Sequence, residues 1–381
     1  MPTAKQVALA VAGSAAAAMV LLHHLGRRRR QFVQKFCRAL PKVELHAHLN
    51  GCARLSTIAE LAPADVDTSA LHVPPDDDRS LDACFAIFAA IHKTVTTLAA
   101  VRRVAAEVLS DFASDNVKYL ELRTTPRDLR DTDAEGCVRA VVAELARFEA
   151  ANPGRMLVRL LLSVDRTGGL AKAEATVELA VKLRAEGCQY VVGVDFSGNP
   201  TQGSFADYVP AFSRARQAGL RVAVHAGEVE HAADNRAILG FGPERLGHAL
   251  LLSVGDFEAL ANAPIPIELC PTSNIKTLRL RGVHEHPTMR MLLRANYPVS
   301  ISTDDSTVFG TTPSRELALA AEGAGLSDEQ IIALALAPLE HAFLEDDAKV
   351  TLREMMAKGA AEGCEAARRN DVPPVGAVRV D

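Results

Sequence analysis

Two histidines, His46 and His48, stand two residues apart in the run Val43–Gly51, which otherwise has the composition of a β-strand. Residues i and i+2 of a strand point to the same side, so both imidazole rings are expected to face one spot. That arrangement supplies half of a metal site on a rigid element. The alternative is a pair of partly exposed histidines at a sheet edge, and the choice depends on further ligands elsewhere in the chain.

Two further candidate ligands directly follow strand-like runs. His225 comes after Arg221–Val224, and Asp304 comes after Val299–Thr303. Three imidazoles and one carboxylate suit zinc and leave a position open for water, which is typical of a catalytic rather than a structural metal site. We therefore expect one Zn²⁺ per chain. The predicted ligands are His46, His48, His225 and Asp304.

Three polar residues lie next to these ligands in the sequence or at another strand end. Glu228 suits proton delivery to an atom that gains electrons, because a carboxylic acid can donate in the transition state. His248 suits guiding or accepting the proton of a water molecule, and Asp305 suits a hydrogen bond to water or substrate. Taken singly, Glu228 reads equally well as an exposed loop carboxylate, and His248 as a buried, hydrogen-bonded core histidine. Their predicted proximity to the ligands favours catalytic roles.

The elements that must position these residues form a repeating pattern of short strands and longer helices, which indicates a parallel sheet. The predicted strands are Lys42–Leu49, Val117–Arg123, Met156–Val164, Tyr190–Asp195, Arg221–Val224, Arg245–His248, Ile265–Cys270 and Val299–Thr303. One long helical region is predicted from Leu81 through Phe112, and outer helices over Ser327–Arg369. The pattern predicts an α/β TIM (β/α)₈ barrel, in which catalytic groups gather at the carboxyl ends of the strands.

Composition limits the class of protein. The chain has 381 residues, 48% of them hydrophobic, and a formal net charge of -5. No basic stripe dominates it, so we expect no nucleic-acid partner. The seven cysteines are dispersed without C-x-x-C pairs, which favours reduced thiols in an intracellular, cytoplasmic protein and argues against cysteine-ligated zinc. We expect one barrel domain over residues 36–370, a loose tail over 371–381, and a monomer.

Residues 1–35 form an apolar and then basic leader. Val7–Leu22 is small and apolar, Arg27–Arg30 follows, and no acidic residue occurs before Glu44. Membrane anchoring, an organellar transit peptide and a disordered extension all remain open. Membrane contact is expected only through this leader, at residues 1–30.

Five ordered motifs between Pro41 and Phe343 resemble those of the adenosine deaminase superfamily. They are His46-Ala47-His48-Leu49-Asn50-Gly51, His225-Ala226-Gly227-Glu228, Arg245-Leu246-Gly247-His248, Cys270-Pro271-Thr272-Ser273-Asn274 and Ser302-Thr303-Asp304-Asp305. The resemblance implies attack of zinc-activated water on C6 of a purine, protonation of N1 by Glu228 and orientation of the attacking oxygen by His248. It further implies that Asp305 contacts N7 and Gly198 contacts N3.

Asn50 departs from ordinary adenosine deaminases, which carry an aspartate there to hold the ribose. A carboxylate would repel a 5′-phosphate at close range, whereas an amide carries no net charge. With Leu122–Arg127, the pattern is most similar to the adenosine deaminase-like branch that acts on N6-methyl-AMP. That resemblance implies a purine nucleotide site to which His48 also belongs. Its other expected residues are Asn50, His92, Thr124, Thr125, Pro126, Arg127, Asp165, Gly198 and Asp305.

Arg127 is the expected cation for the phosphate, although a solvated surface arginine is an equal alternative, and His92 could equally be a core residue. The predicted function is zinc-dependent hydrolytic removal of the N6 amine or methylamine from a purine 5′-monophosphate, giving IMP. One alternative is an adenosine deaminase that acts on the free nucleoside, which Asn50 disfavours. A cyclic-amide hydrolase is disfavoured because no lysine follows Asp195. A catalytically silent nucleotide-binding or membrane-tethered protein is the alternative from another class.

Overall fold

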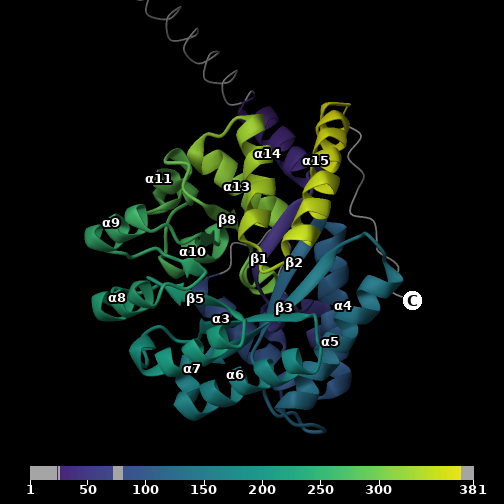
Figure 1. Ribbon diagram of the computed structural model, residues 1–381. Coiled ribbons are helices and arrows are strands. Elements are labelled where there is room, and N and C mark those ends of the chain that lie inside the picture. The colour runs from purple at the N-terminus through teal and green to yellow at the C-terminus, as the bar shows by residue number, and fades with distance from the viewer. Residues whose placement is uncertain (1–23, 25, 72–79, 370–381) are drawn as a thin grey trace, which may run out of the picture.

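The computed structural model describes residue 24 and residues 26–71 and 80–369 (Figure 1). Residues 1–23 of the expected leader and the expected tail from residue 371 lie outside this described part. Residues 26–39 are helical, and Val33, Phe36, Cys37 and Leu40 at this helix are buried. This helix therefore packs against the body of the protein.

Eight parallel strands form one sheet in the order β1 to β8. They are β1 (Lys42–His48), β2 (Val117–Thr124), β3 (Leu157–Asp165), β4 (Val191–Ser197), β5 (Arg221–Ala226), β6 (Arg245–His248), β7 (Ile267–Leu269) and β8 (Val299–Ile301). The sheet closes where the chain beyond β8 meets β1: Asp304 donates its backbone N–H to His46 O at 2.8 Å, and His48 donates to Asp304 O at 2.9 Å. The predicted (β/α)₈ barrel is confirmed.

Helices follow the strands and surround the barrel (Figure 1). They are α2 (Leu55–Leu61), α3 (Leu81–Thr94), α4 (Leu98–Ser114), α5 (Ala134–Ala151), α6 (Leu170–Ala185), α7 (Phe205–Gln217), α8 (Ala232–Phe241), α9 (Val254–Asn262), α10 (Pro271–Thr277), α11 (Met289–Arg294), α12 (Ser306–Phe309), α13 (Pro313–Ala324), α14 (Asp328–Leu336) and α15 (Asp346–Arg369). The helical region predicted over Leu81–Phe112 consists of two helices, α3 and α4. Thr97 starts a second helix there, because its side chain accepts from Ala100 N at 3.3 Å and satisfies an otherwise free donor.

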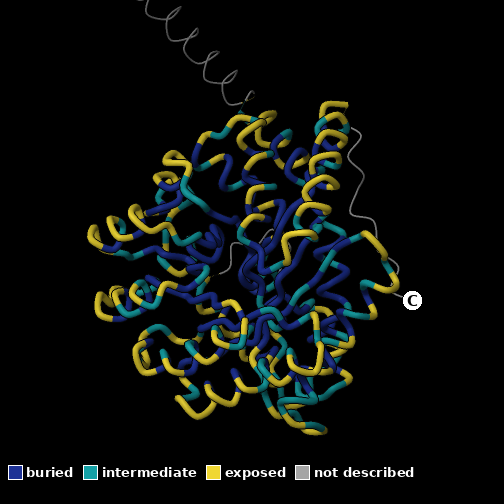
Figure 2. Tube along the Cα trace, viewed as in Figure 1, coloured by how far each residue is buried: buried dark blue, intermediate teal, exposed yellow. Residues whose placement is uncertain are grey.

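The apolar core lies between the sheet and the helices. Leu120 and Leu122 of β2 are fully buried in it together with Val104 of α4 and Val141 of α5. Figure 2 shows the same division, with buried strands inside and exposed outer faces of the helices. Among the described residues, no helix is long and apolar enough to cross a bilayer.

The interior of the barrel below the strand ends contains buried charged side chains as well as apolar ones. Glu121 and Arg123 alternate with the core leucines of β2, and both are completely buried. Arg245 of β6 stacks over the Phe343 ring at 3.6 Å, and the Phe343 N–H donates to Glu121. The segment between α14 and α15 thus covers one end of the barrel, and the polar strand ends are left at the other.

Candidate active site

A cavity of about 620 Å³ opens at the carboxyl ends of the strands. Its wall includes residues that follow β1, β2, β3, β4, β5, β6 and β8, so side chains far apart in the sequence meet in one space. Ligand-binding and catalytic groups of parallel barrels collect at this end. The positions of the predicted metal ligands, the predicted acid and the predicted substrate contacts can therefore all be described relative to this one cavity.

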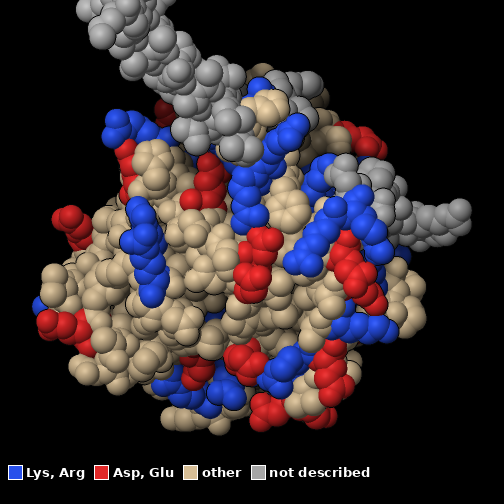
Figure 3. All heavy atoms as spheres, turned by 90° about the horizontal axis from the view of Figure 1, so that it is seen from above, with Lys and Arg blue, Asp and Glu red and all other residues tan. Residues whose placement is uncertain are grey.

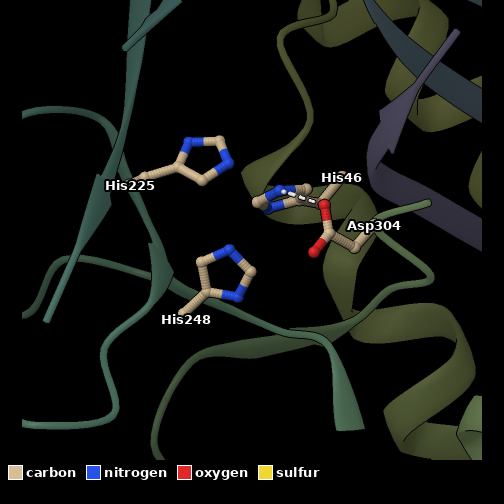
Figure 4. A group of neighbouring side chains, drawn as sticks. All are labelled: His46, His225, His248 and Asp304. Atoms are coloured by element: carbon tan, nitrogen blue, oxygen red, sulfur yellow. Dashed lines mark ion pairs between the residues drawn. The ribbon is translucent and has the colours of Figure 1, made fainter. Parts of the chain in front are cut away.

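Four buried side chains form a cluster at the floor of this cavity. His46, His225, His248 and Asp304 each offer a ligand atom, and these atoms all lie within 4.8 Å of one another. Figure 4 shows the three rings and the carboxylate pointing toward a common space. A buried group of three imidazoles and one carboxylate is compatible with a metal site, and it contains His248 in the place where the sequence predicted His48.

His48 belongs to the same cluster and faces its centre. Its Nε2 lies 3.3 Å from Nε2 of His46, 3.3 Å from Nε2 of His225 and 3.4 Å from Asp304 Oδ1. Atoms that bind one shared zinc ion at about 2.0–2.2 Å lie no more than about 4.4 Å apart, because each is one bond length from the ion. Each of these three distances is compatible with one ion shared by His48 and the neighbouring residue.

Hydrogen bonds to the outer atoms of three of these residues fix their orientation. His46 Nδ1 lies 2.7 Å from Glu268 Oε2, and His225 Nδ1 lies 2.9 Å from the carbonyl oxygen of Phe196. The Ser273 hydroxyl donates to Asp304 Oδ2 at 2.7 Å. Because each outer atom is engaged, Nε2 of the histidines and Oδ1 of Asp304 remain directed at the shared space.

Glu268 is itself held by two buried arginines. Arg245 Nε donates to Glu268 Oε1 at 2.6 Å, and Arg123 donates to Oε2 and, at 2.8 Å, to Asp195. Burial alone would raise the pKa of Glu268, but the guanidinium groups of Arg123 and Arg245 hold it well below its usual range. The carboxylate beside His46 therefore stays ionised, and the charges below the cluster are paired as buried charges must be.

Glu228 and His248 face each other across the cavity, with Glu228 Oε1 3.9 Å from His248 Nε2. Burial raises the pKa of Glu228, and the negative charge of Asp304 adds to the rise while His225 opposes it. Burial also lowers the pKa of His248 well below its ordinary value. The Glu228 carboxyl group therefore holds its proton more tightly than an exposed glutamate does, and it stands beside an imidazole that holds its proton less tightly, a pairing that suits an acid catalyst.

Asp305 is buried beside Asp304 and lines the cavity. Burial and the neighbouring Asp304 carboxylate raise the pKa of Asp305 well above its usual range. Asp304 and His248 both adopt positive φ angles, 63° and 62°. Non-glycine residues rarely occupy this region, and such strain concentrates at functional sites.

Most predicted substrate residues line the cavity, but two do not. Asn50, His92, Thr124, Thr125, Asp165 and Gly198 contribute to the wall. Pro126 and Arg127 are absent from it. Arg127 donates to the carbonyl oxygen of Val95 at 2.7 Å and lies 3.3 Å from His92 Nδ1, so it stands behind His92.

Helix α3 supplies an apolar wall that the sequence did not reveal. Leu81, Cys84, Phe85 and Phe88 line the cavity, and the Phe85 side chain is 61% exposed. Their spacing is that of any amphipathic helix, so the sequence alone gives no sign that they face a ligand. An exposed phenylalanine at a cavity mouth provides apolar surface for a planar ring.

The charged residues below the cluster, Glu268, Arg123 and Asp195, were also not predicted as parts of the site. Glu268 lies between Ile267 and Leu269 of β7, Asp195 lies between Val194 and Phe196 of β4, and Arg123 follows Leu122 in β2. Polar residues inside a parallel strand were a usable signal, because such strands are normally apolar throughout.

Comparisons with known proteins agree with this geometry. The family described as adenosine deaminase matches residues 41–359. The N6-mAMP deaminase of Arabidopsis thaliana is 38% identical over 351 residues, which cover 84% of this chain and 97% of that protein. The apo structure of the A. thaliana N6-methyl-AMP deaminase superposes with a TM-score of 0.79 at 37% identity, covering 86% and 99% of the two chains. Arabidopsis ADAL complexed with GMP superposes with a TM-score of 0.78 at 38% identity, covering 86% and 99%.

Proposed function

Because this chain belongs to the adenosine deaminase family, we propose that it hydrolyses N6-methyl-AMP to IMP and methylamine. Its relatives of 33–38% identity over most of the chain include N6-methyl-AMP deaminases. In this reaction the oxygen of water bonds to C6 of the purine, N1 gains a proton, and the N6 substituent leaves as an amine. AMP, which would release ammonia, is a substrate of the same chemical type.

The proposed cofactor is one Zn²⁺, held by His46, His48, His225 and Asp304. The donor set and the spacing of 3.3–3.4 Å support this assignment. Bound zinc lowers the pKa of water towards neutrality and so supplies a nucleophile at physiological pH. The supporting contacts of Glu268, Phe196 and Ser273 keep the ligand atoms aimed at that position.

Three residues are proposed to act on the purine ring. Glu228, a carboxyl group of raised pKa, donates a proton to N1, so that electron density arriving as C6 is attacked has an acceptor. His248 orients the attacking oxygen. Asp305, whose pKa burial raises well above its usual range, donates a hydrogen bond to N7. Gly198, with φ 97°, lets backbone approach N3 where a side chain would intrude.

The proposed phosphate end of the site lies toward Asn50, Thr124, Thr125 and His92. The complex of Arabidopsis ADAL with GMP supports a cavity that accepts a nucleoside monophosphate. Asn50 brings no negative charge to it. Arg127 is proposed to contribute through His92, since its guanidinium lies behind that ring, and Pro126 and Asp165 to shape the neighbouring loops.

The combination of a mononuclear donor set with a Glu228 carboxyl group of raised pKa in one cavity carries this proposal. The test is to incubate the zinc-loaded full chain with N6-methyl-AMP and to identify IMP and methylamine by mass spectrometry. Glu228→Gln is the matched variant, because it keeps the shape but removes the acid. We expect its turnover to fall by roughly 10²–10⁴-fold while zinc content, measured by atomic emission, stays the same.

Two outcomes would contradict the proposal. A zinc-loaded native enzyme that releases no amine would leave the catalytically silent nucleotide-binding protein as the better account. A fully active Glu228→Gln variant would remove the proton-donor role.

A further inference from the structure

A buried chain of hydrogen bonds runs from the start of α11 to His248. His286 Nδ1 lies 3.1 Å from Met289 N, and His286 Nε2 lies 3.0 Å from Asn274 Oδ1. Asn274 Nδ2 in turn lies 3.0 Å from His248 Nδ1. His286, Asn274 and His248 are each less than a tenth exposed, so water does not compete for these contacts.

The direction of each hydrogen bond follows from donors that cannot be reversed. A backbone N–H only donates. The Cys270 N–H points at Asn274 Oδ1 at 3.2 Å, which makes that atom the amide oxygen and places the amide nitrogen toward His248. At the other end, the N–H of Met289 makes His286 Nδ1 an acceptor.

The hydrogen bonds at Cys270 and at His286 require the same orientation of the Asn274 amide. Burial lowers the pKa of His286 to about 4, so the ring is neutral near pH 7 and carries one proton. Because Nδ1 accepts, that proton is on Nε2, and Nε2 donates to Asn274 Oδ1. The amide orientation required by His286 is therefore the one that Cys270 requires independently.

We propose that Asn274 and His286 are positioning residues that fix the tautomer of His248. The amide nitrogen of Asn274 can only donate, so His248 Nδ1 accepts and the ring proton is on Nε2. Nε2 is the atom that faces Glu228 Oε1 at 3.9 Å in the cavity. His248 is thereby a hydrogen-bond donor to the attacking oxygen and has no lone pair there with which to take a proton.

The catalytic consequence rests on the proposed deaminase function, whereas the tautomer does not. If these hydrogen bonds served only the structure, they would join α10 to α11, and the tautomer of His248 would not affect catalysis. The two accounts differ in what happens when Asn274 is replaced by a residue of the same shape that cannot donate.

The experiment is ¹⁵N NMR of the zinc-loaded, full-length enzyme with labelled histidine. The signals of the His248 ring are assigned as those that disappear in the His248→Gln variant. We expect an unprotonated Nδ1 and a protonated Nε2. In the Asn274→Asp variant the carboxylate accepts from Nδ1–H, so Nδ1 becomes protonated.

For the Asn274→Asp variant we expect kcat for N6-methyl-AMP to fall by about 10–100-fold, as for other residues that support metal ligands, with KM and zinc content unchanged.

His284→Ala is the control, because His284 is exposed in the same segment and lies outside the relay. We expect it to keep both the tautomer and kcat. A protonated Nδ1 in the native enzyme would overturn the inference, and this reading needs no variant to fold. An Asn274→Asp enzyme with the native tautomer and native kcat would overturn it as well. The expected tautomer in an enzyme that releases no amine would instead count against the proposed function.

Discussion

Asn50 stands at the first turn after β1, where the cavity wall passes from the metal-facing histidines toward Thr124 and Thr125. A side chain at this point lies between the reacting end and the proposed phosphate end of the substrate. An amide there can donate and accept hydrogen bonds without adding charge. We therefore expect Asn50 to tolerate a doubly charged 5′-phosphate, which a carboxylate would repel.

Changing Asn50 to Asp is predicted to reduce kcat/KM for N6-methyl-AMP by roughly tenfold or more, because a nearby like charge costs on the order of 1–2 kcal/mol in a partly solvated cavity. Turnover of the uncharged nucleosides adenosine and N6-methyladenosine should fall much less. Steady-state kinetics on matched nucleotide and nucleoside pairs provide the measurement. Equal losses for both members of a pair would show that Asn50 does not respond to the phosphate.

At the scale of the elements, the site depends on close packing between the turn after β1 and the start of α12. Gly51 lies against Asp305 so closely that an added Cβ would sit 1.7 Å from Asp305 Oδ1 and 2.5 Å from Asp305 Cβ. Asp305 is also the residue before α12, so its backbone cannot move freely away. The absence of a side chain at Gly51 is thus a condition for the position of Asp305.

Gly51→Ala is predicted to displace Asp305 and to reduce kcat/KM by roughly a hundredfold, the usual effect of misplacing a substrate contact by about 1 Å. Zinc content should be retained, since Ser273 holds the Asp304 carboxylate separately. Gly240→Ala in α8 is the matched control, because an added Cβ there meets nothing within 4 Å. An active Gly51→Ala enzyme with unchanged kinetics would mean that Asp305 does not need its present position.

The strands and the metal-facing residues were predictable because their signals are local. His46 and His48 show strand periodicity, and polar residues directly follow apolar runs at His225 and Asp304. Barrel topology then brings these ends together. The order of all eight strands follows from the same alternation, although β7 and β8 are shorter than predicted.

Contacts that depend on three-dimensional packing were not predictable. The break between α3 and α4 depends on capping by Thr97, which competes with a continuous helical pattern. The side of α3 that faces the cavity and the position of Arg127 behind His92 are set by how the helix rests on the barrel. The tautomer of His248 depends on Asn274 and His286, which lie in other segments of the chain.

At the scale of the whole molecule, the chain carries charged groups of both signs. The chain carries a net charge of -5, and on the face shown in Figure 3 the Lys and Arg side chains are interleaved with Asp and Glu. On that face, the described Lys and Arg side chains are divided by acidic ones, which is unlike the continuous basic stripe of a nucleic-acid-binding surface. Other charged groups are buried, either below the cluster of His46, His225 and Asp304 or between outer elements.

Glu316 of α13 is one such buried charge, and it makes stability depend on pH. Its carboxyl accepts from Thr272 N at 2.8 Å and contacts the hydroxyl groups of Thr272 and Thr311. Burial raises the pKa of Glu316 from 4.5 to about 7. The folded protein therefore binds a proton that the unfolded chain has released, and this stabilisation is lost as pH rises through the folded pKa.

The free energy of unfolding of the native enzyme should therefore fall relative to that of Glu316→Gln between about pH 4.5 and about pH 7. The difference between the two proteins is expected to change by on the order of 3 kcal/mol across this window. Urea unfolding of both proteins at matched pH values isolates this group, because the other titrating groups are common to both. A difference that is independent of pH would show that Glu316 is ionised throughout.

The most direct test of the account is the relative kcat/KM of the zinc-loaded enzyme on N6-methyl-AMP, AMP, N6-methyladenosine and adenosine. The cavity, the metal-facing cluster and the neutral Asn50 predict that each monophosphate is turned over faster than its nucleoside by at least about tenfold, with N6-methyl-AMP yielding IMP. A preference for adenosine over both monophosphates would contradict the account and would identify the protein as a nucleoside deaminase instead.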